Sequence, residues 1–447
     1  MNAHVRPRLL QAPAAGQFSH QPFQVYTQRD LERIAPLSQL PAAFRFDMQV
    51  VSTVLPFRVN QYVIDELIDW ERVPDDPIFQ LTFPQRGMLE PHHFDLIADL
   101  LRGGAEPALM QEAVAQVRAE LNPHPAGQME LNMPTDEAGN RLEGIQHKYR
   151  ETVLFFPCQG QTCHAYCTFC FRWAQFVGDK TLRIASSESA ALLRYLRSHP
   201  EVTDLLVTGG DPMVMKTKHL ATYLEPLLAP EFDHLQTVRI GTKALSFWPH
   251  RFLGAEDADD LLRLLERLQQ GGKHVALMAH FNHWRELETP AVREAIRRLR
   301  DTGVQIRCQG PLVAHINDDP QVWRRLWNTQ VSLGLMPYYL FVERDTGARN
   351  YFEVPLVRAW EIYRQAVQGV SGLGRTARGP SMSASPGKVE IQGVTEVAGE
   401  KVFVLRFIQA RNPEWVQQPF FARFDPEATW FDQLRPAFGA EQFFFEQ

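Results

Sequence analysis

The sequence lacks the features that define several common protein classes. No apolar run approaches the roughly 18 residues that cross a bilayer, and residues 1–21 have no apolar centre of the kind found in signal peptides. The net charge of -6 provides no basic surface for nucleic acid. We therefore expect a cytoplasmic protein that binds neither membrane nor nucleic acid. The 447 residues, 45% of them hydrophobic, suffice for one main domain with extensions.

Cysteine is scarce, and its distribution argues against a disulfide framework. Only five cysteines are present, and four of them fall within residues 158–170. Such a cluster is typical of a metal site in a reducing compartment. The fifth, Cys308, lies alone in an apolar stretch, so we expect it to fill the core.

Three of the clustered cysteines, Cys163, Cys167 and Cys170, are spaced four and three residues apart after an apolar run. A curled loop with this spacing can bring three thiolates to one iron–sulfur cluster. Three ligands leave one metal position open for chemistry, whereas Cys158 could supply a fourth thiolate and close the site. Zinc is disfavoured, because structural zinc sites usually pair two Cys-x2-Cys motifs and this chain has one.

From about residue 151 the chain alternates short apolar strands with amphipathic helices. Six such units predict a parallel sheet with right-handed crossovers, and six rather than eight predict an α/β fold with an open, partial (βα)6 TIM-like barrel. Ligands bind such sheets at the carboxyl ends of the strands. We expect strands at 152–156, 204–208, 237–241, 275–280, 304–308 and 337–342, and helices at 188–198, 218–228, 258–269, 290–302, 320–333 and 355–370.

The flanking segments have other patterns. Residues 1–40 are rich in Gln, Pro and Ala and are predicted to form a flexible arm, and residues 41–150 show the periodicity of a helical extension. The barrel is assigned to residues 151–371. A turn-rich linker at 371–380 is then expected to lead into a C-terminal extension, residues 372–447, with a short β element and a docked aromatic tail.

With an aromatic residue just before its last cysteine, the Cys-x3-Cys-x2-Cys motif resembles that of the radical S-adenosylmethionine (SAM) superfamily. The resemblance implies that Cys163, Cys167 and Cys170 ligate a [4Fe-4S] cluster whose fourth iron is chelated by SAM. It also implies a 5'-deoxyadenosyl radical that abstracts hydrogen from a substrate. Cys158 would then be a bystander, because one iron must stay open.

Further motifs lie at predicted strand ends. Gly209-Gly210-Asp211 follows the second strand, and taken alone it fits a plain β-turn as well as a backbone that approaches a ligand. Its position about 40 residues after the cysteines resembles the Gly-Gly motif that receives the SAM amino group. His280 ends the fourth strand and Gln309 the fifth, where either could also be an ordinary buried polar residue.

Several blocks in order resemble the lysine 2,3-aminomutase family, from about Phe57 to about Gly393. In that family pyridoxal 5'-phosphate (PLP) holds an α-amino acid while its nitrogen migrates to the adjacent carbon. The matching blocks are His147-Lys-Tyr149, Val238-Arg-Ile-Gly-Thr242, His280-Phe-Asn-His283, Asn317-Asp318 and Pro337-Tyr-Tyr339.

Carried over residue by residue, the resemblance assigns a cofactor or substrate role to eight residues besides the cysteines. Without it, Lys148, Arg172 and Lys388 could each be ordinary surface cations. The implied SAM-binding residues are Gly209, Gly210, Asp211, His280 and Gln309; Lys148 would bind the PLP phosphate, Lys388 the PLP aldehyde and Arg172 the substrate carboxylate.

The sequence departs from the family at the PLP lysine and at the substrate end of the site. Ser383-Ala-Ser-Pro-Gly-Lys388 is shorter than the family block Asp-Ala-Pro-Gly-Gly-Gly-Gly-Lys and lacks its Asp, one of two acids that recognise the lysine ammonium. The second acid aligns with Arg344, or with Asp345 after a one-residue shift. Because a desolvated arginine repels an ammonium group, free lysine is not the expected substrate.

The leading hypothesis is a radical SAM enzyme of the aminomutase type, with PLP, that acts on an amino acid or a related metabolite. The expected partners are this small molecule, an electron donor such as flavodoxin or ferredoxin and, as an option, a second copy of the chain. An alternative keeps the cluster and SAM but not PLP, and performs oxidation, epimerisation or carbon–sulfur bond formation. A third hypothesis is a metal-binding module without catalytic activity.

Overall fold

The computed structural model describes residues 21–178, 184–187 and 189–446, and its centre is an 11-stranded sheet. The six predicted strands are present, and each pairs in parallel with the next, which confirms the α/β fold with a parallel sheet. They are β4 (Thr152–Phe155), β5 (Asp204–Val207), β6 (Thr237–Thr242), β7 (His274–His280), β8 (Gln305–Leu312) and β9 (Met336–Val342).

The six predicted helices follow these strands. Each forms because it has an apolar face: in α9, for example, Leu261, Leu264, Leu265 and Leu268 are fully buried against the sheet. Residue 188, the first residue predicted for α6, lies outside the described part of the chain. The helices are α6 (Ser189–Ser198), α7 (Thr217–Leu224), α9 (Ala258–Gln270), α10 (Pro290–Asp301), α11 (Pro320–Ser332) and α13 (Leu356–Gln368), with short helices α8 (Ala244–Phe247) and α12 (Arg349–Phe352) between them.

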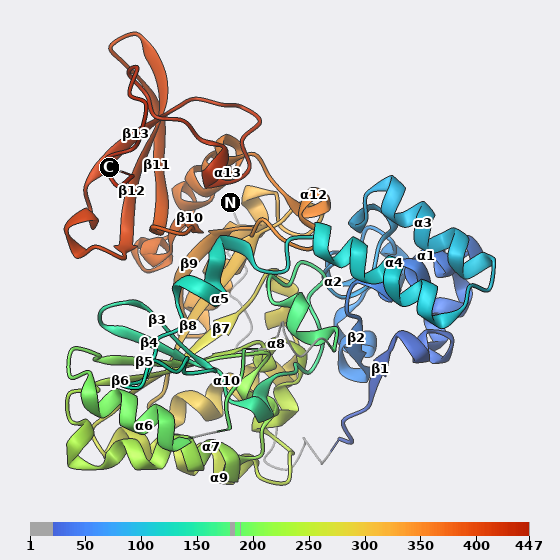
Figure 1. The fold of residues 1–447 in the computed structure, drawn as a ribbon. Coiled ribbons are helices and arrows are strands. Elements are labelled where there is room, and N and C mark those ends of the chain that lie inside the picture. The colour runs from blue at the N-terminus through green and yellow to red at the C-terminus, as the bar shows by residue number, and fades with distance from the viewer. Residues whose placement is uncertain (1–20, 179–183, 188, 447) are drawn as a thin grey trace, which may run out of the picture.

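The N-terminal extension is helical and has its own hydrophobic core beside the barrel (Figure 1). Its helices are α1 (Ala42–Val54), α2 (Pro77–Thr82), α3 (Pro91–Arg102), α4 (Pro107–Glu120) and α5 (Gln128–Leu131). The arm predicted to be flexible differs from expectation where it is described. There β1 (Val25–Thr27) pairs with β2 (Arg58–Asn60), and Leu31, Ile34 and Leu37 are buried in the same core; residues 1–20 lie outside the description.

The C-terminal strands continue the central sheet (Figure 1). The linker prediction is wrong from Arg378 onward, because β10 (Arg378–Ser383) pairs in parallel with β9. Gly379 and Pro380 suggested a turn, yet they lie inside this strand, where a side chain at Gly379 would collide with the Leu340 carbonyl oxygen. The remaining strands are antiparallel: β11 (Gly387–Val397), β12 (Glu400–Ala410) and β13 (Pro419–Arg423) at one edge, and β3 (Ile145–Tyr149) at the other.

The aromatic tail is docked, as predicted. Phe443 is buried, and the Phe445 ring centre lies 5.1 Å from that of Phe407 in β12. Cys308 is 2% exposed in the barrel core, which confirms its structural role. No helix in the described residues is long and apolar enough to cross a membrane.

The C-terminal aromatic cluster predicts a stability effect. Replacing Phe407, which is fully buried, by alanine should destabilise the fold by about 3–5 kcal/mol through a cavity between the strands and the tail. Urea denaturation followed by tryptophan fluorescence would measure the change. Phe438→Ala is the matched control, because this side chain is 47% exposed and should lose little. Equal destabilisation of the two variants would contradict the docked tail.

Candidate functional site

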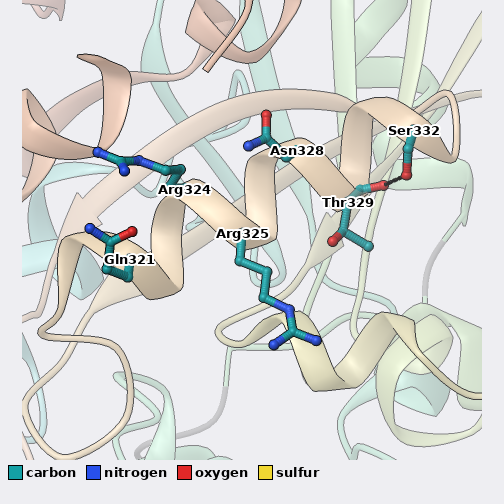
Figure 2. A pocket seen from close by; sticks show the side chains of 6 residues that line it. All are labelled: Gln321, Arg324, Arg325, Asn328, Thr329 and Ser332. Atoms are coloured by element: carbon teal, nitrogen blue, oxygen red, sulfur yellow. Dashed lines mark hydrogen bonds between the residues drawn. The ribbon is translucent and has the colours of Figure 1, made fainter. Parts of the chain in front are cut away.

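Two hollows in the described part of the chain differ in the residues that line them, and one of the two gathers most of the predicted site residues. A surface hollow of about 530 Å³ is lined entirely by α11: Gln321, Arg324, Arg325, Asn328, Thr329 and Ser332 (Figure 2). In Figure 2 these side chains leave the helix in different directions and converge on no common point. The other, an interior cavity of about 340 Å³, lies at the carboxyl ends of β5–β9. Ten of the eleven predicted site residues line it; the exception is Lys148.

The three predicted cluster cysteines all belong to the cavity wall. Cys163, Cys167 and Cys170 all line it, whereas Cys158 lies in a short 3-10 helix, Cys158–Gly160, and does not. Burial raises the pKa of all three lining thiols, that of Cys170 to about 11. Three half-buried thiols on one cavity wall become thiolates readily when a metal centre supplies positive charge, so the donor set fits a cluster with three protein ligands.

The N-terminal extension holds the cysteine loop in place. The Tyr166 amide donates to the Arg58 carbonyl oxygen at 2.8 Å, and the Thr168 amide donates to the Leu81 carbonyl oxygen at 3.0 Å. The buried Asn60 side chain donates to the His164 carbonyl oxygen at 3.1 Å. Phe169, between two of the cysteines, packs in the core of the extension. The loop is therefore shaped by residues about 100 positions earlier in the chain.

The Gly209-Gly210 turn packs against the cysteine loop from the other side. A Cβ atom on Gly210 would lie 2.5–2.7 Å from the Thr162 backbone, and the Asp211 amide donates to the Thr162 carbonyl oxygen at 2.7 Å. The sequence suggested that these glycines admit a ligand. In the structure the close neighbour of Gly210 is the cysteine loop, although both glycines also line the cavity.

The Asp211 carboxylate is occupied by donors from the chain itself. It accepts from the Thr242 hydroxyl and from the amides of Met213 and Lys243, all at 2.8–2.9 Å. Burial raises the pKa of Asp211 to about 6 despite these donors. Asp211 thus ties the β5 turn to the end of β6 and orients the turn, which is a positioning role beside its predicted contact with SAM.

Of the two histidines near the end of β7, only His280 belongs to the cavity. Its Nε2 atom is buried without a hydrogen-bond partner, and burial beside Lys243 lowers its pKa well below the usual range, so the ring is neutral. An unpaired imidazole nitrogen on the wall is available to a ligand. His283 instead caps the following 3-10 helix, where its Nδ1 accepts from the Arg285 amide at 3.3 Å. Gln309 lies beside His280 on the neighbouring strand.

Lys388 lines the same cavity as the cysteines and lies at the start of β11. Its ammonium group is 4.3 Å from the Tyr339 ring centre, and burial together with Arg239, Arg378 and Lys148 lowers its pKa to about 7. An amine with this pKa is substantially neutral at pH 7, as a lysine that bonds an aldehyde must be.

Lys148 does not line the cavity, but it lies next to the turn that carries Lys388. Its ammonium group donates to the Ala384 carbonyl oxygen, and burial with the nearby charges of Arg411 and Arg344 lowers its pKa to about 7. Arg411 donates from Nε to the Ser385 carbonyl oxygen at 2.9 Å. Lys148 and Arg411 both donate hydrogen bonds to this turn, and such nitrogen donors fit the phosphate of a PLP group attached to Lys388.

Arg172 and Arg344 both line the cavity, and both lie beside the ring of Phe171, the residue after Cys170. Arg172 donates to the Gly209 carbonyl oxygen at 3.1 Å, and its guanidinium carbon lies 4.5 Å from the Phe156 ring centre. Arg344 and its neighbour Glu343 line the cavity and Asp345 does not, so the acid offered by a one-residue shift, Asp345, lies off the wall.

Several cavity residues were missed from the sequence. Lys243 bonds Glu286 at 2.6 Å, a fully buried acid, and lies between Asp211 and His280. Lys243 directly follows the Val238–Thr242 block, and this position in the sequence could have indicated that it belongs to the site. Glu343 also lines the cavity, at the end of β9. Arg411 follows no motif, and only the pairing of β11 with β12 brings it to the Lys388 turn.

The close contact between Gly210 and Thr162 predicts that a side chain at position 210 would displace the cysteine loop. Gly210→Ala should displace the loop, lower the melting temperature by an amount equivalent to about 1–3 kcal/mol and reduce iron bound after reconstitution. Calorimetry and iron analysis would measure both effects. Gly372→Ala is the control, because no atom lies within 4 Å of the added methyl group. Full iron loading in Gly210→Ala would show that the contact is dispensable.

Sequence comparison places the chain among known proteins, although no family model matches it. It is 32% identical over 397 residues to "Putative L-lysine 2,3-aminomutase" of Aquifex aeolicus, which covers 89% of this chain and 92% of that protein. It is 29% identical to L-lysine 2,3-aminomutase of Escherichia coli and 28% to that of Bacillus subtilis, over 54% and 53% of this chain and 66% and 46% of those proteins.

Among solved structures, Streptococcus suis SuiB bound to S-adenosylmethionine aligns with 61% of this chain and 57% of its own, at 12% identity and a TM-score of 0.35. The family assignment rests on the sequence match to the Aquifex protein, which spans nearly the whole of both chains. In this protein, the cysteine loop, the Gly-Gly turn and Lys388 of β11 all line one cavity. The protein is a member of the lysine 2,3-aminomutase-like family of radical SAM enzymes.

Proposed function

We propose that this radical SAM enzyme is a PLP-dependent aminomutase that moves an amino group between adjacent carbons of an amino acid other than lysine. The observation that carries the proposal is the shared cavity: three thiols line it together with a lysine whose amine is substantially neutral. A radical-generating centre and an aldehyde-binding amine within one small volume suit a reaction that needs both.

The two cofactors would supply the chemistry, and the chain would hold them. Cys163, Cys167 and Cys170 would hold the cluster, which would supply the electron that cleaves SAM, and Lys388 would hold PLP, whose ring would stabilise an unpaired electron. Residues at the strand ends would bind SAM between them: the Gly209-Gly210 turn, His280 and Gln309. A small electron-transfer protein such as flavodoxin or ferredoxin would provide the electron.

The protein's own residues would then orient and shield the substrate. Arg172 can hold the α-carboxylate through a bidentate contact, since its guanidinium uses one hydrogen bond to Gly209 and keeps other donors available. Phe156 and Phe171 flank that guanidinium at 4.5 and 5.2 Å from their ring centres and exclude water from it. A dry wall protects a carbon-centred radical from side reactions.

The first test separates the proposed reaction from its alternative. Anaerobic enzyme with SAM, PLP and dithionite should form 5'-deoxyadenosine with its substrate and give a product of unchanged mass and altered amino position, detected by mass spectrometry and NMR. Stoichiometric loss of SAM with a change in product mass would instead support PLP-independent chemistry. No 5'-deoxyadenosine with any tested amino acid would count against catalysis altogether.

The cysteine assignments have their own matched pair of variants. Cys163→Ala should lose most bound iron and all 5'-deoxyadenosine formation, because the cluster keeps only two ligands. Cys158→Ala should retain both, because Cys158 does not line the cavity. Iron loss of similar extent in the two variants would show that Cys158 is a ligand.

The pKa of Lys388 predicts a distinctive pH dependence for PLP attachment. Because the neutral amine is the reactive form, PLP trapped on Lys388 by borohydride should be half-maximal near pH 7, its pKa being about 7, and level off above it. Exposed Lys218, which does not line the cavity, is the control site and should be trapped far less than Lys388 at pH 7, because nothing there positions PLP. Peptide mass spectrometry would measure both sites. Trapping on Lys148, or equal trapping on Lys388 and Lys218 at pH 7, would contradict the assignment.

A further inference from the structure

The Lys243 ammonium group lies on the cavity wall, but the chain itself satisfies it. Lys243 lines the cavity and is 7% exposed. Its Nζ atom donates to Glu286 Oε2 at 2.6 Å, to Asn282 Oδ1 at 3.1 Å and to the His280 carbonyl oxygen at 3.3 Å. An ammonium group has three N–H donors, so these acceptors use all of them. Lys243 therefore has no donor left for SAM or for a substrate.

Glu286, the partner of Lys243, is filled in the same way. Its side chain is fully buried. Oε1 accepts from the amides of Asn282 and His283 at 2.6 and 2.7 Å. Oε2 accepts from Lys243 and from the Ser246 hydroxyl. Each carboxylate oxygen thus accepts two hydrogen bonds, and the ion pair is closed to ligands.

The contacts of this pair join the ends of neighbouring strands. Lys243 directly follows β6, and its amide donates at 2.8 Å to Asp211 Oδ2 in the turn after β5. His280 ends β7, and Asn282 lies two residues later. The Asn282 side chain also donates to the Pro311 carbonyl oxygen in β8, at 3.4 Å. One hydrogen-bonded network therefore links β5, β6, β7 and β8, which are adjacent in the sheet.

The residues proposed to bind SAM lie at the same strand ends. The Gly209-Gly210 turn follows β5, His280 ends β7 and Gln309 lies in β8. His280 and Gln309 are register partners across the two strands. Groups that bind one ligand together must keep their mutual geometry, and an error of about 1 Å is costly. The network fixes the spacing of the strand ends that carry these groups.

We propose that Lys243 and Glu286 are a positioning pair, which sets the SAM-binding strand ends without touching SAM. The inference rests on the proposed function for the place where SAM binds. Lys243 acts through the His280 carbonyl group and the Asp211 carboxylate. Glu286 acts through the backbone of Asn282 and the residue after it.

The cysteine loop does not depend on this pair. Its backbone bonds the carbonyl groups of Arg58 and Leu81, and the Asn60 side chain bonds the His164 carbonyl oxygen. These contacts come from the N-terminal extension. Loss of the pair should therefore disturb SAM binding more than it disturbs the binding of iron.

A competing role for the pair is stability alone. Removing one partner leaves a buried charge unpaired, which destabilises a fold whatever else the pair does, whereas replacing both partners by neutral groups is often neutral for stability. In Lys243→Met/Glu286→Gln the new amide oxygen can still accept from the amides of Asn282 and His283. The contacts of Lys243 with His280 and Asn282 stay lost. The double variant therefore separates positioning from stability.

SAM titration calorimetry and thermal denaturation of the cluster-loaded full chain, without reductant, test the inference. Lys243→Met should lower the melting temperature and weaken SAM binding roughly 10- to 100-fold. Bound iron and borohydride-trapped PLP should stay at the wild-type level. Lys243→Met/Glu286→Gln should regain most of the melting temperature but not the SAM affinity, and it decides the matter if Lys243→Met does not fold.

Lys273→Met is the control variant. Lys273 is also a buried lysine, and its Nζ atom donates to the carbonyl oxygens of Phe232 and Leu235 at 2.7 and 2.8 Å. It directly precedes β7, at the opposite end of the strand from His280, and does not line the cavity. Lys273→Met should lose stability and keep its SAM affinity.

Three results would overturn the positioning role. They are wild-type SAM affinity in Lys243→Met, recovery of SAM affinity together with stability in the double variant, and SAM binding in Lys273→Met as weak as in Lys243→Met. A wild-type protein that binds no SAM would overturn both the SAM site and this role.

The same variants keep the positioning role separate from the proposed reaction. If SAM affinity follows the expected pattern but the reduced wild-type enzyme forms no mass-neutral isomer, the reaction fails and the positioning pair stands. If the isomer forms and Lys243→Met binds SAM as the wild type does, the positioning pair fails and the reaction stands.

Discussion

The site depends on a cysteine loop that is held from both sides by backbone contacts. On one side, the amides of Tyr166 and Thr168 bond carbonyl groups of the N-terminal extension. On the other, the Asp211 amide bonds Thr162, and Gly210 leaves no room for a side chain between the two segments. A loop of this kind has little regular structure to fix it, so these contacts decide where the three thiols lie. The helical extension is therefore part of the site and not an accessory to the barrel.

Burial shapes the chemistry of the cavity in two opposite ways. It lowers the pKa of Lys388 to about 7 and keeps His280 neutral, which makes both nitrogens available. Arginine cannot respond in this way, so Arg172 and Arg344 stay charged in the same environment. Neutral nucleophilic groups and fixed cations therefore coexist on one wall. The neutral nitrogens can bond a ligand, and the arginine cations can orient anions.

The departures from the family concentrate where the substrate would lie. The chain aligns with its Aquifex relative over 89% of its length. Arg344 and the shortened turn before Lys388 change the charge and the shape of the cavity wall. A family can keep its radical-generating parts and alter specificity by such changes, because the two sets of residues come from different strand ends.

The sequence by itself determined the alternating architecture and the residues that gather at the strand ends. Periodicity predicts the six strands and six helices because each must bury one face, and motifs at the strand ends meet wherever a sheet is parallel. Tertiary structure decided the rest. It shows Asp211 saturated by its own chain, His283 turned into a helix cap, Arg344 rather than Asp345 on the wall, and Gly379-Pro380 inside a strand. These outcomes depend on contacts between residues far apart in the chain, such as Asn60 with His164 and Lys148 with Ala384, which no local pattern encodes.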